Sequence, residues 1–185
     1  MKEKAKNEVL HLGIAEQGKL HALSGNHKEA LRHYREAMRQ AVEQKSPEVF
    51  FQHYTQCVME SLELTGAHDE VINYCQKMQD FLNDQLDVNP LVKQNLGSTL
   101  EKEGIQWLLK GEADNARPLL EEAQKVAGRG RLPLTDQLLS YVQRGYRIDK
   151  RQIKDLQKRH HYFIVRADRV DKARAIELPK SVSPF

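Results

Sequence analysis

Eight histidines and two cysteines are the residues of this chain that most readily carry chemistry. No two histidines have the H-x-x-x-H spacing beside a third ligand, and the H-E-x-x-H motif of zinc proteases is absent. His160 and His161 are neighbours, so on a helix their side chains would point in different directions. Cys57 and Cys75 lack the C-x-x-C spacing of metal or redox sites. The sequence therefore predicts no metal site and no cofactor.

The motifs of common enzyme active sites are also missing. The sequence has no glycine-rich phosphate loop, no nucleophile elbow and no catalytic pair of carboxylates. The basic turn at residues 128–131 is more typical of a linker than of a phosphate cradle. Cys75 and Trp107 lie at positions expected in an apolar core. We therefore expect no catalytic residue and a protein that is not an enzyme.

A dense run of cations lies in the last third of the chain. Its members are Arg144, Arg147, Lys150, Arg151, Lys154, Lys158 and Arg159. Tyr141, Tyr146 and Tyr162 are interleaved with them, and aromatic rings among cations can stack on nucleobases. The net charge is about −5 for residues 1–128 and about +8 for residues 129–185. The run is a candidate polyanion-binding site. The rival interpretation is the solvent-exposed face of a capping helix.

Amphipathic helices must position these residues, because apolar side chains recur at steps of three and four along most of the chain. The predicted helix pairs span residues about 11–45, 47–86 and 90–127. Basic C-terminal helices follow over residues 132–176, with one long helix at about 149–176, and residues 177–185 form a flexible tail. A short strand at residues 162–166 is the alternative there, because its residues are mostly β-branched or aromatic.

One spacing pattern of small and large residues occurs three times. The first copy has Gly18, Gly25, Ala30, Tyr34 and Ala37, the third has Gly104, Gly111, Ala116, Leu120 and Ala123, and a weaker middle copy has Met59, Gly66, Val71, Cys75 and Met78. The period is 41 residues from Ala30 to Val71 and 45 residues from Val71 to Ala116. Such self-similarity is typical of a solenoid. Antiparallel helices pack closely only where small side chains stand between them, which explains the alternation of sizes.

These residues resemble the tetratricopeptide repeat, a helix-turn-helix module, over residues about 11–127. The period is longer than the standard repeat of about 34 residues and is similar to that of kinesin light chain and related bacterial arrays. The resemblance implies an all-α fold, a right-handed α-solenoid of three helix pairs with a C-terminal capping helix pair.

In that family the first helix of each pair lines a concave groove that holds a segment of another protein. By resemblance, the groove residues here are Leu12, Ala15, Lys19, Ala22, His53, Gln56, Glu60, Ser98, Glu101, Ile105 and Leu108. Some members clamp a terminal carboxylate with asparagine and basic residues, and only Lys19 and Lys102 fit that scheme here. A mixed groove with Lys19 and Glu60 instead favours an amphipathic helix or a polar peptide.

The sequence thus predicts a protein-interaction module, acting as an adaptor, chaperone or regulator, whose partner is another protein or a peptide segment. The alternative is a nucleic-acid-associated or regulatory protein that uses the basic C-terminal helix. A second copy of the chain is a further candidate partner, through Phe163, Val165 and Val170 on that helix. No apolar run reaches the ~18 residues needed to cross a bilayer and no signal core is present, so we expect no membrane insertion and a cytoplasmic location.

Overall fold

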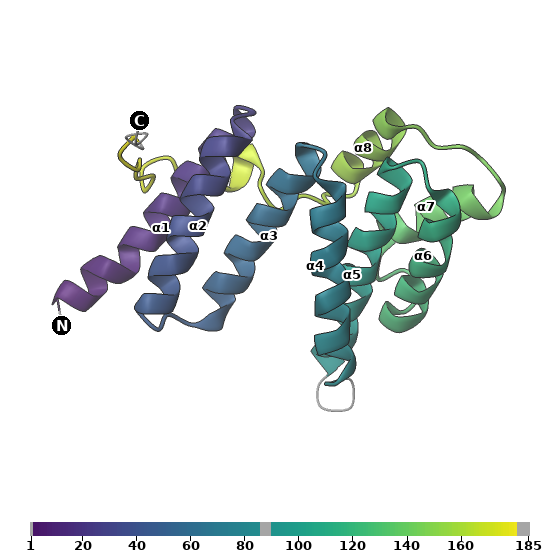
Figure 1. The fold of residues 1–185 in the computed structure, drawn as a ribbon, viewed down its shortest axis with the longest axis horizontal. Coiled ribbons are helices and arrows are strands. Elements are labelled where there is room, and N and C mark those ends of the chain that lie inside the picture. Colours follow the sequence, from purple (N-terminus) through teal and green to yellow (C-terminus); the bar gives the residue numbers. More distant parts are fainter. Residues whose placement is uncertain (1, 86–89, 181–185) are drawn as a thin grey trace. The chain divides into compact units, whose positions relative to one another are not determined.

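The structure is a computed structural model that describes residues 2–85 and 90–180 (Figure 1). Within these ranges the chain is all-α and contains no strand, which confirms the predicted fold class at this level. The elements are α1 (Lys2–Leu23), α2 (His27–Glu43), α3 (Glu48–Leu64), α4 (His68–Asn83), α5 (Pro90–Leu109), α6 (Ala113–Ala127), α7 (Pro133–Gln143), α8 (Lys150–Arg159) and the short 3₁₀ helix η1 (Ala167–Arg169). Each of the three predicted ranges therefore holds two helices.

Glycines end the first helix of each pair. Gly25, Gly66 and Gly111 have φ angles of 81°, 82° and 82°, a left-handed conformation that glycine adopts without steric cost. After α1, the N–H of Asn26 donates to the carbonyl of His21 at 2.9 Å, so the turn is a Schellman motif. The same bonding closes α5 at Gly111. The repeated glycines of the sequence thus have a local backbone role.

The contacts divide the chain into two compact units, which are described separately. The first unit comprises Met1–Thr65 and Phe163–Phe185, and the second comprises Gly66–Tyr162. In the first unit α2 packs between α1 and α3. In the second unit α5 packs against α4, α6 and α8, and α7 packs against α6.

The small residues of the repeat allow the close helix packing that the sequence predicts. A Cβ atom on Gly18 would lie 2.7 Å from the ring of Tyr34, and one on Gly104 would lie 2.8 Å from Leu120. A real Cβ atom is not found at such distances, so a larger residue at either position would force the facing side chain to move. The repeat residues Ala30, Tyr34, Ala37, Val71, Cys75, Ala116, Leu120 and Ala123 are all fully buried.

The core of the second unit joins the last repeat pair to the helices that follow it. Ile105, Leu138 and Ile153, from α5, α7 and α8, are fully buried in one apolar cluster. Buried Glu101 of α5 accepts hydrogen bonds from the N–H and the hydroxyl of Thr135, at 3.1 and 2.6 Å, in the first turn of α7. The carboxylate therefore satisfies an N–H group that the start of a helix leaves without an intrahelical partner.

The predicted long helix over residues 149–176 is wrong, and so is the alternative strand at residues 162–166. Helix α8 ends at Arg159, and His161 takes a left-handed φ of 51° while the N–H of Tyr162 bonds to the Gln157 carbonyl at 2.9 Å. Beyond this turn the chain has no α-helix or strand as far as residue 180, and η1 and a turn at residues 172–174 interrupt its extended stretches. Ile164, Val165, Ile176 and Leu178 join apolar clusters with residues of α1–α3. Phe163, Val165 and Val170 lie outside any helix, so the helix expected to pair with a second copy is absent. Residues 177–180 of the predicted flexible tail are described, and Glu177, Leu178 and Pro179 contact α1 and α2, whereas 181–185 lie outside the described part.

Candidate protein-binding surface

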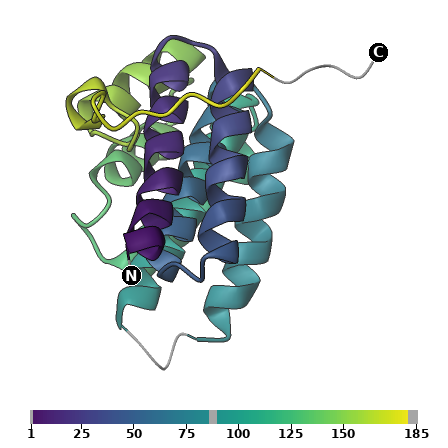
Figure 2. The same cartoon turned by 90° about the vertical axis from the view of Figure 1, so that its left-hand side faces the viewer.

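An extended segment of the chain itself lies across α1 and α2 of the first unit (Figure 2). We call residues 163–180 the strap. Main-chain N–H groups of the strap donate to α1 and α3, and its aliphatic side chains enter the apolar clusters between these helices. The surface on α1–α3 therefore holds an extended peptide, and its contacts define the candidate site.

Glu60 of α3 holds the first part of the strap. Its carboxylate accepts hydrogen bonds from the N–H groups of Ile164 and, at 3.1 Å, Val165. Glu60 is only 4% exposed, so these charge-assisted bonds form in a setting with little water. The side chains of Ile164 and Val165 pack beside Ala22 of α1 and Cys57 of α3. The Glu60 carboxylate thus binds main-chain N–H groups, and the apolar cluster around it accepts aliphatic side chains.

The middle of α1 makes the closest approach to the strap. The N–H of Ile176 donates to the Gly13 carbonyl at 2.9 Å, and the N–H of Asp171 donates to Glu16 at 2.7 Å. A Cβ atom on Gly13 would lie 2.6 Å from the Arg174 carbonyl oxygen and 2.5 Å from the Ile176 side chain. Only glycine leaves room for the strap here. The other oxygen of Glu16 pairs with Lys19 at 2.7 Å, so the two charges are balanced beside the strap.

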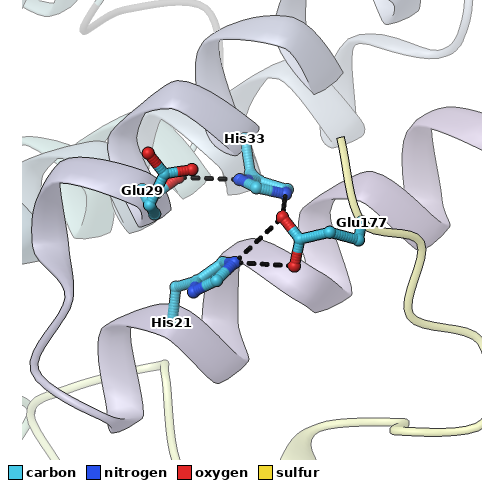
Figure 3. A group of neighbouring side chains, drawn as sticks. All are labelled: His21, Glu29, His33 and Glu177. Carbon is cyan, nitrogen blue, oxygen red and sulfur yellow. Dashed lines mark hydrogen bonds and ion pairs between the residues drawn. The ribbon is translucent and has the colours of Figure 1, made fainter. Parts of the chain in front are cut away.

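Two histidines meet the carboxylate of Glu177 near the end of the strap (Figure 3). His21 Nε2 of α1 lies 2.9 Å from Glu177 Oε2, and His33 Nε2 of α2 lies 2.9 Å from Glu177 Oε1. His33 is fully buried, and its Nδ1 bonds to the main-chain carbonyl of Glu29 at 2.8 Å. Arg32 donates to the Pro179 carbonyl at 2.9 Å. The aliphatic neighbours of the carboxylate, Ile176 and Leu178, pack on the cluster around Ile14 and Ala15.

The predicted groove residues of the first unit divide into those near the strap and those away from it. Glu60 bonds to the strap, and Ala15 and Ala22 belong to the clusters that it covers. Lys19 is buried and paired with Glu16. His53 is half-buried, and burial, together with the charge of Lys19, lowers its pKa. Leu12 is half-buried, Gln56 is exposed, and neither makes a hydrogen bond to the strap.

The predicted groove residues of α5 do not line an open surface. Ile105 and Leu108 are buried in the cluster that α7 and α8 complete, and Glu101 bonds to Thr135. Only Ser98 is exposed. The sequence could not separate these roles, because an apolar face looks the same whether a partner or the chain's own next helix covers it. Lys102 donates to the Tyr162 hydroxyl at 3.2 Å instead of facing a free carboxylate.

Sequence reasoning missed Gly13, Glu16, His21 and His33, all of which contact the strap. His21 and Glu177 are 156 residues apart, and no local pattern connects them. The one available signal was Gly13 itself, a glycine inside a helical stretch, which marks a close backbone approach once turns are excluded.

The seven candidate polyanion-binding cations are exposed, and none of them forms an ion pair with another residue that the structure describes. Beside them is a cavity of about 360 Å³. Its lining residues are Tyr141, Tyr146, Arg147, Ile148, Gln152, Asp155, Leu156 and Arg159. The rings of Tyr141 and Tyr146 meet edge to face with centroids 6.3 Å apart. Cationic and aromatic groups thus gather at the α7–α8 connection.

The two cysteines are free and buried. Burial raises the pKa of Cys57 to about 12, despite the opposing charge of Lys19. A thiol that stays protonated at neutral pH is a poor nucleophile and a poor metal ligand. Both side chains therefore serve the core.

A comparison with known protein families, with curated proteins and with solved structures finds no match for this chain. Among the described residues, no helix has the length and apolar character needed to cross a membrane.

Proposed function

We propose that this protein is a non-enzymatic interaction module of the tetratricopeptide type that holds an extended protein segment on α1–α3. The observation that carries the proposal is the strap, which occupies this surface in the manner of a peptide ligand. Its N–H groups bond to Glu60, Glu16 and the Gly13 carbonyl, which are contacts that any extended chain can make. The surface thus provides affinity through the main chain and selectivity through its apolar clusters.

The side chains of the strap indicate the chemistry of the partner. Ile164 and Val165 fill the cluster beside Glu60, and Ile176 and Leu178 flank the carboxylate that meets His21 and His33. A partner segment would carry two aliphatic pairs, the second with an acidic residue between its members. Because the strap competes within the same molecule, it reduces the partner's apparent affinity by the fraction of time that it occupies the surface. This arrangement suits a regulator or adaptor more than a permanent scaffold.

Two further parts of the proposal rest on the sequence resemblance and on composition. The glycine-ended helix pairs and their glycine–tyrosine and glycine–leucine contacts support the tetratricopeptide assignment. The right-handed solenoid of three pairs stays a prediction. The two free cysteines support a cytoplasmic location, since oxidising compartments favour disulfides.

The proposal is tested by supplying the strap as a separate peptide. Ile164→Asp combined with Ile176→Asp should release the strap, because each carboxylate would be buried in an apolar cluster. A fluorescent peptide with the sequence of residues 163–180 should bind this variant, and should bind the wild-type chain at least ~10-fold more weakly. The same peptide carrying both aspartates is the control and should not bind.

A second step connects this binding to partner selection. Peptides selected from a random library on the strap-released variant should be enriched in an aliphatic–acidic–aliphatic triplet and should compete with the 163–180 peptide. Adding Gly13→Ala should abolish their binding, because the methyl group occupies the space of the ligand backbone. Equal binding of the 163–180 peptide to released and wild-type chains, or selected peptides that ignore Gly13→Ala, would contradict the proposal.

The exposed cations of the α7–α8 region support polyanion binding as a second candidate function. Phosphate contacts make affinity fall steeply with salt, by a slope of roughly −0.7 to −0.9 per phosphate neutralised. Lys154→Glu with Lys158→Glu should weaken binding of a single-stranded oligonucleotide and make the salt slope shallower by about 1.4, which is about 0.7 for each of two lost phosphate contacts. Lys77→Glu, also exposed but on α4, is the matched control. Salt-independent binding, or an equal effect of Lys77→Glu, would exclude this function.

A further inference from the structure

The cluster at the end of the strap concentrates atoms that bear lone pairs. His21, Glu29, His33 and Glu177 each contribute a nitrogen or oxygen atom, and these atoms lie within 4.8 Å of one another (Figure 3). The cluster draws on three parts of the first unit, because His21 comes from α1, Glu29 and His33 from α2, and Glu177 from the strap. His21, His33 and Glu177 come from three separate segments, so no local spacing of histidines or cysteines indicated the cluster.

The hydrogen bonds of His33 show which of its ring nitrogens presents a lone pair to the Glu177 carboxylate. Its Nδ1 lies 2.8 Å from the Glu29 carbonyl oxygen, which can only accept, so Nδ1 carries a proton. In the neutral imidazole Nε2 then presents a lone pair, and it lies 2.9 Å from a carboxylate oxygen of Glu177. His21 Nε2 faces both oxygens of the same carboxylate, at 2.9 and 3.2 Å. The two Nε2 atoms thus converge on one carboxylate, and a metal ion placed among them would accept lone pairs from all three side chains.

We propose that His21 Nε2, His33 Nε2 and the Glu177 carboxylate bind a divalent transition-metal ion, with Zn²⁺ as the best match. Two imidazoles and one carboxylate are a common protein ligand set for zinc. Ligands about 2.0–2.2 Å from a tetrahedral ion lie about 3.3–3.6 Å from one another. The nitrogen–oxygen separations of 2.9 to 3.2 Å are close to this range, so small side-chain rotations admit the ion.

The surroundings of the ligands favour this ion. The hydrogen bond from His33 Nδ1 to the Glu29 carbonyl fixes the imidazole orientation, as such bonds do for most metal-bound histidines. The Glu29 carboxylate forms an ion pair with Arg32 at 2.8 Å, so we do not count it among the ligands. A water molecule would then take the fourth coordination position of the ion. The N–H of Leu178 lies 3.1 Å from His33 Nε2, and the ion replaces this hydrogen bond.

The ion would join the strap to α1 and α2 at one point. Since it binds the closed strap and not the released one, metal should stabilise the closed state by mass action. The site itself does not depend on a partner. Its effect on partner access rests on the proposed function, and the peptide assays for that function are run with a chelator present so that the two can fail separately.

The test is a Zn²⁺ titration of the untagged, full-length chain after chelator treatment. We expect one Zn²⁺ per chain by calorimetry, and at least ~10-fold weaker binding in Glu177→Gln and in His21→Gln. These side chains are 53% and 19% exposed, so both variants should fold, and circular dichroism checks this. The controls are Glu112→Gln and His161→Asn, exposed residues outside the cluster, whose affinity should equal that of the wild type.

X-ray absorption of the zinc-loaded chain provides the second measurement. Two imidazoles with nitrogen about 2.0–2.1 Å from the ion are expected, and the Glu177→Gln variant should lose this signal. Hydrogen exchange at residues 171–178 should slow when zinc is added to the wild type and should not change in His21→Gln. Equal affinity of the cluster variants and the wild type would mean an adventitious ion only, and absence of zinc binding would mean that hydrogen bonds alone hold the cluster together. Either result overturns the proposal.

Discussion

Tyr34 is a buried residue whose polar group the fold does not use. Its side chain is fully buried, and its hydroxyl has no hydrogen-bond partner among the described residues. Burial raises its pKa, with the nearby Cys57 and Glu60 adding to the effect. The ring is required as the counterpart of Gly18, but the hydroxyl costs free energy because it leaves water without compensation.

We therefore expect Tyr34→Phe to keep or raise the free energy of unfolding, by up to ~1 kcal/mol. Tyr54→Phe is the matched control. The Tyr54 hydroxyl bonds to His11 Nδ1 at 2.6 Å, so its removal should cost ~1–3 kcal/mol. Urea unfolding of the two variants measures the difference. Equal losses in both would mean that the Tyr34 hydroxyl does have a partner in solution.

Glu101 makes the stability of the second unit depend on pH. Burial raises its pKa, and the hydrogen bonds from Thr135 oppose that shift only in part. A carboxyl group whose pKa is higher in the folded state stabilises the fold while it is protonated. That contribution disappears as the pH rises through the folded-state pKa.

Glu101→Gln should therefore gain stability relative to the wild type as the pH rises from acid to neutral. The amide oxygen of glutamine can still accept from Thr135, so the cap of α7 is retained. Thermal unfolding of the two chains over this pH range is the measurement. Parallel stability curves would show that Glu101 ionises in the fold without cost.

At the scale of elements, the strap and α1 depend on the absence of a side chain at Gly13. Alanine there should favour α1 by about 0.5–1 kcal/mol, yet its methyl group would lie 2.6 Å from the Arg174 carbonyl. The contact is with main chain, so the strap must move. Gly13→Ala should thus increase hydrogen exchange at Ile176 while the helical circular dichroism stays unchanged. Leu23→Ala, an exposed change on the same helix, should affect neither, and unchanged exchange at Ile176 in Gly13→Ala would contradict the docking.

The helices were predictable from the sequence because their signals are local. Gly25 and Gly111 end helices through their own backbone conformation, and Pro133 starts α7 at the expected residue. Residues 160–176 have the same three- and four-residue steps, but the N–H groups of Ile164, Val165, Asp171 and Ile176 bond to α1 and α3 in place of a helix of their own. Periodicity shows that side chains will be buried, and it cannot tell which neighbour buries them.

The candidate site was predictable only where it coincides with a repeat position. Ala15, Ala22 and Glu60 were expected from the resemblance to the tetratricopeptide repeat, in which the first helix of each pair lines the groove, and these three lie at the strap. The meeting of His21 and His33 with Glu177 depends on where the strap crosses the helices. Long-range contacts of this kind leave no pattern in a single sequence.

At the scale of the whole molecule, the two units differ in how the chain builds them. One is a single stretch of sequence, and the other is formed from segments near both ends of the described chain. The second unit spans Gly66–Tyr162, whereas the first is completed only when the strap returns to α1–α3. The strap supplies main-chain hydrogen bonds, each worth about 1 kcal/mol, and aliphatic cover for the clusters around Ile14 and Tyr34. The cluster around Ile105 and Leu138 contains no strap residue.

A chain that ends at Tyr162 should therefore lose stability in one unit only. We expect faster amide exchange throughout α1–α3 and unchanged exchange in α5–α8, measured peptide by peptide by mass spectrometry. The full-length Ile164→Asp, Ile176→Asp variant should give the same pattern, which separates loss of docking from loss of the residues themselves. If exchange rises equally in α1–α3 and α5–α8, the two units unfold together, and the strap stabilises the entire chain instead of the surface that it covers.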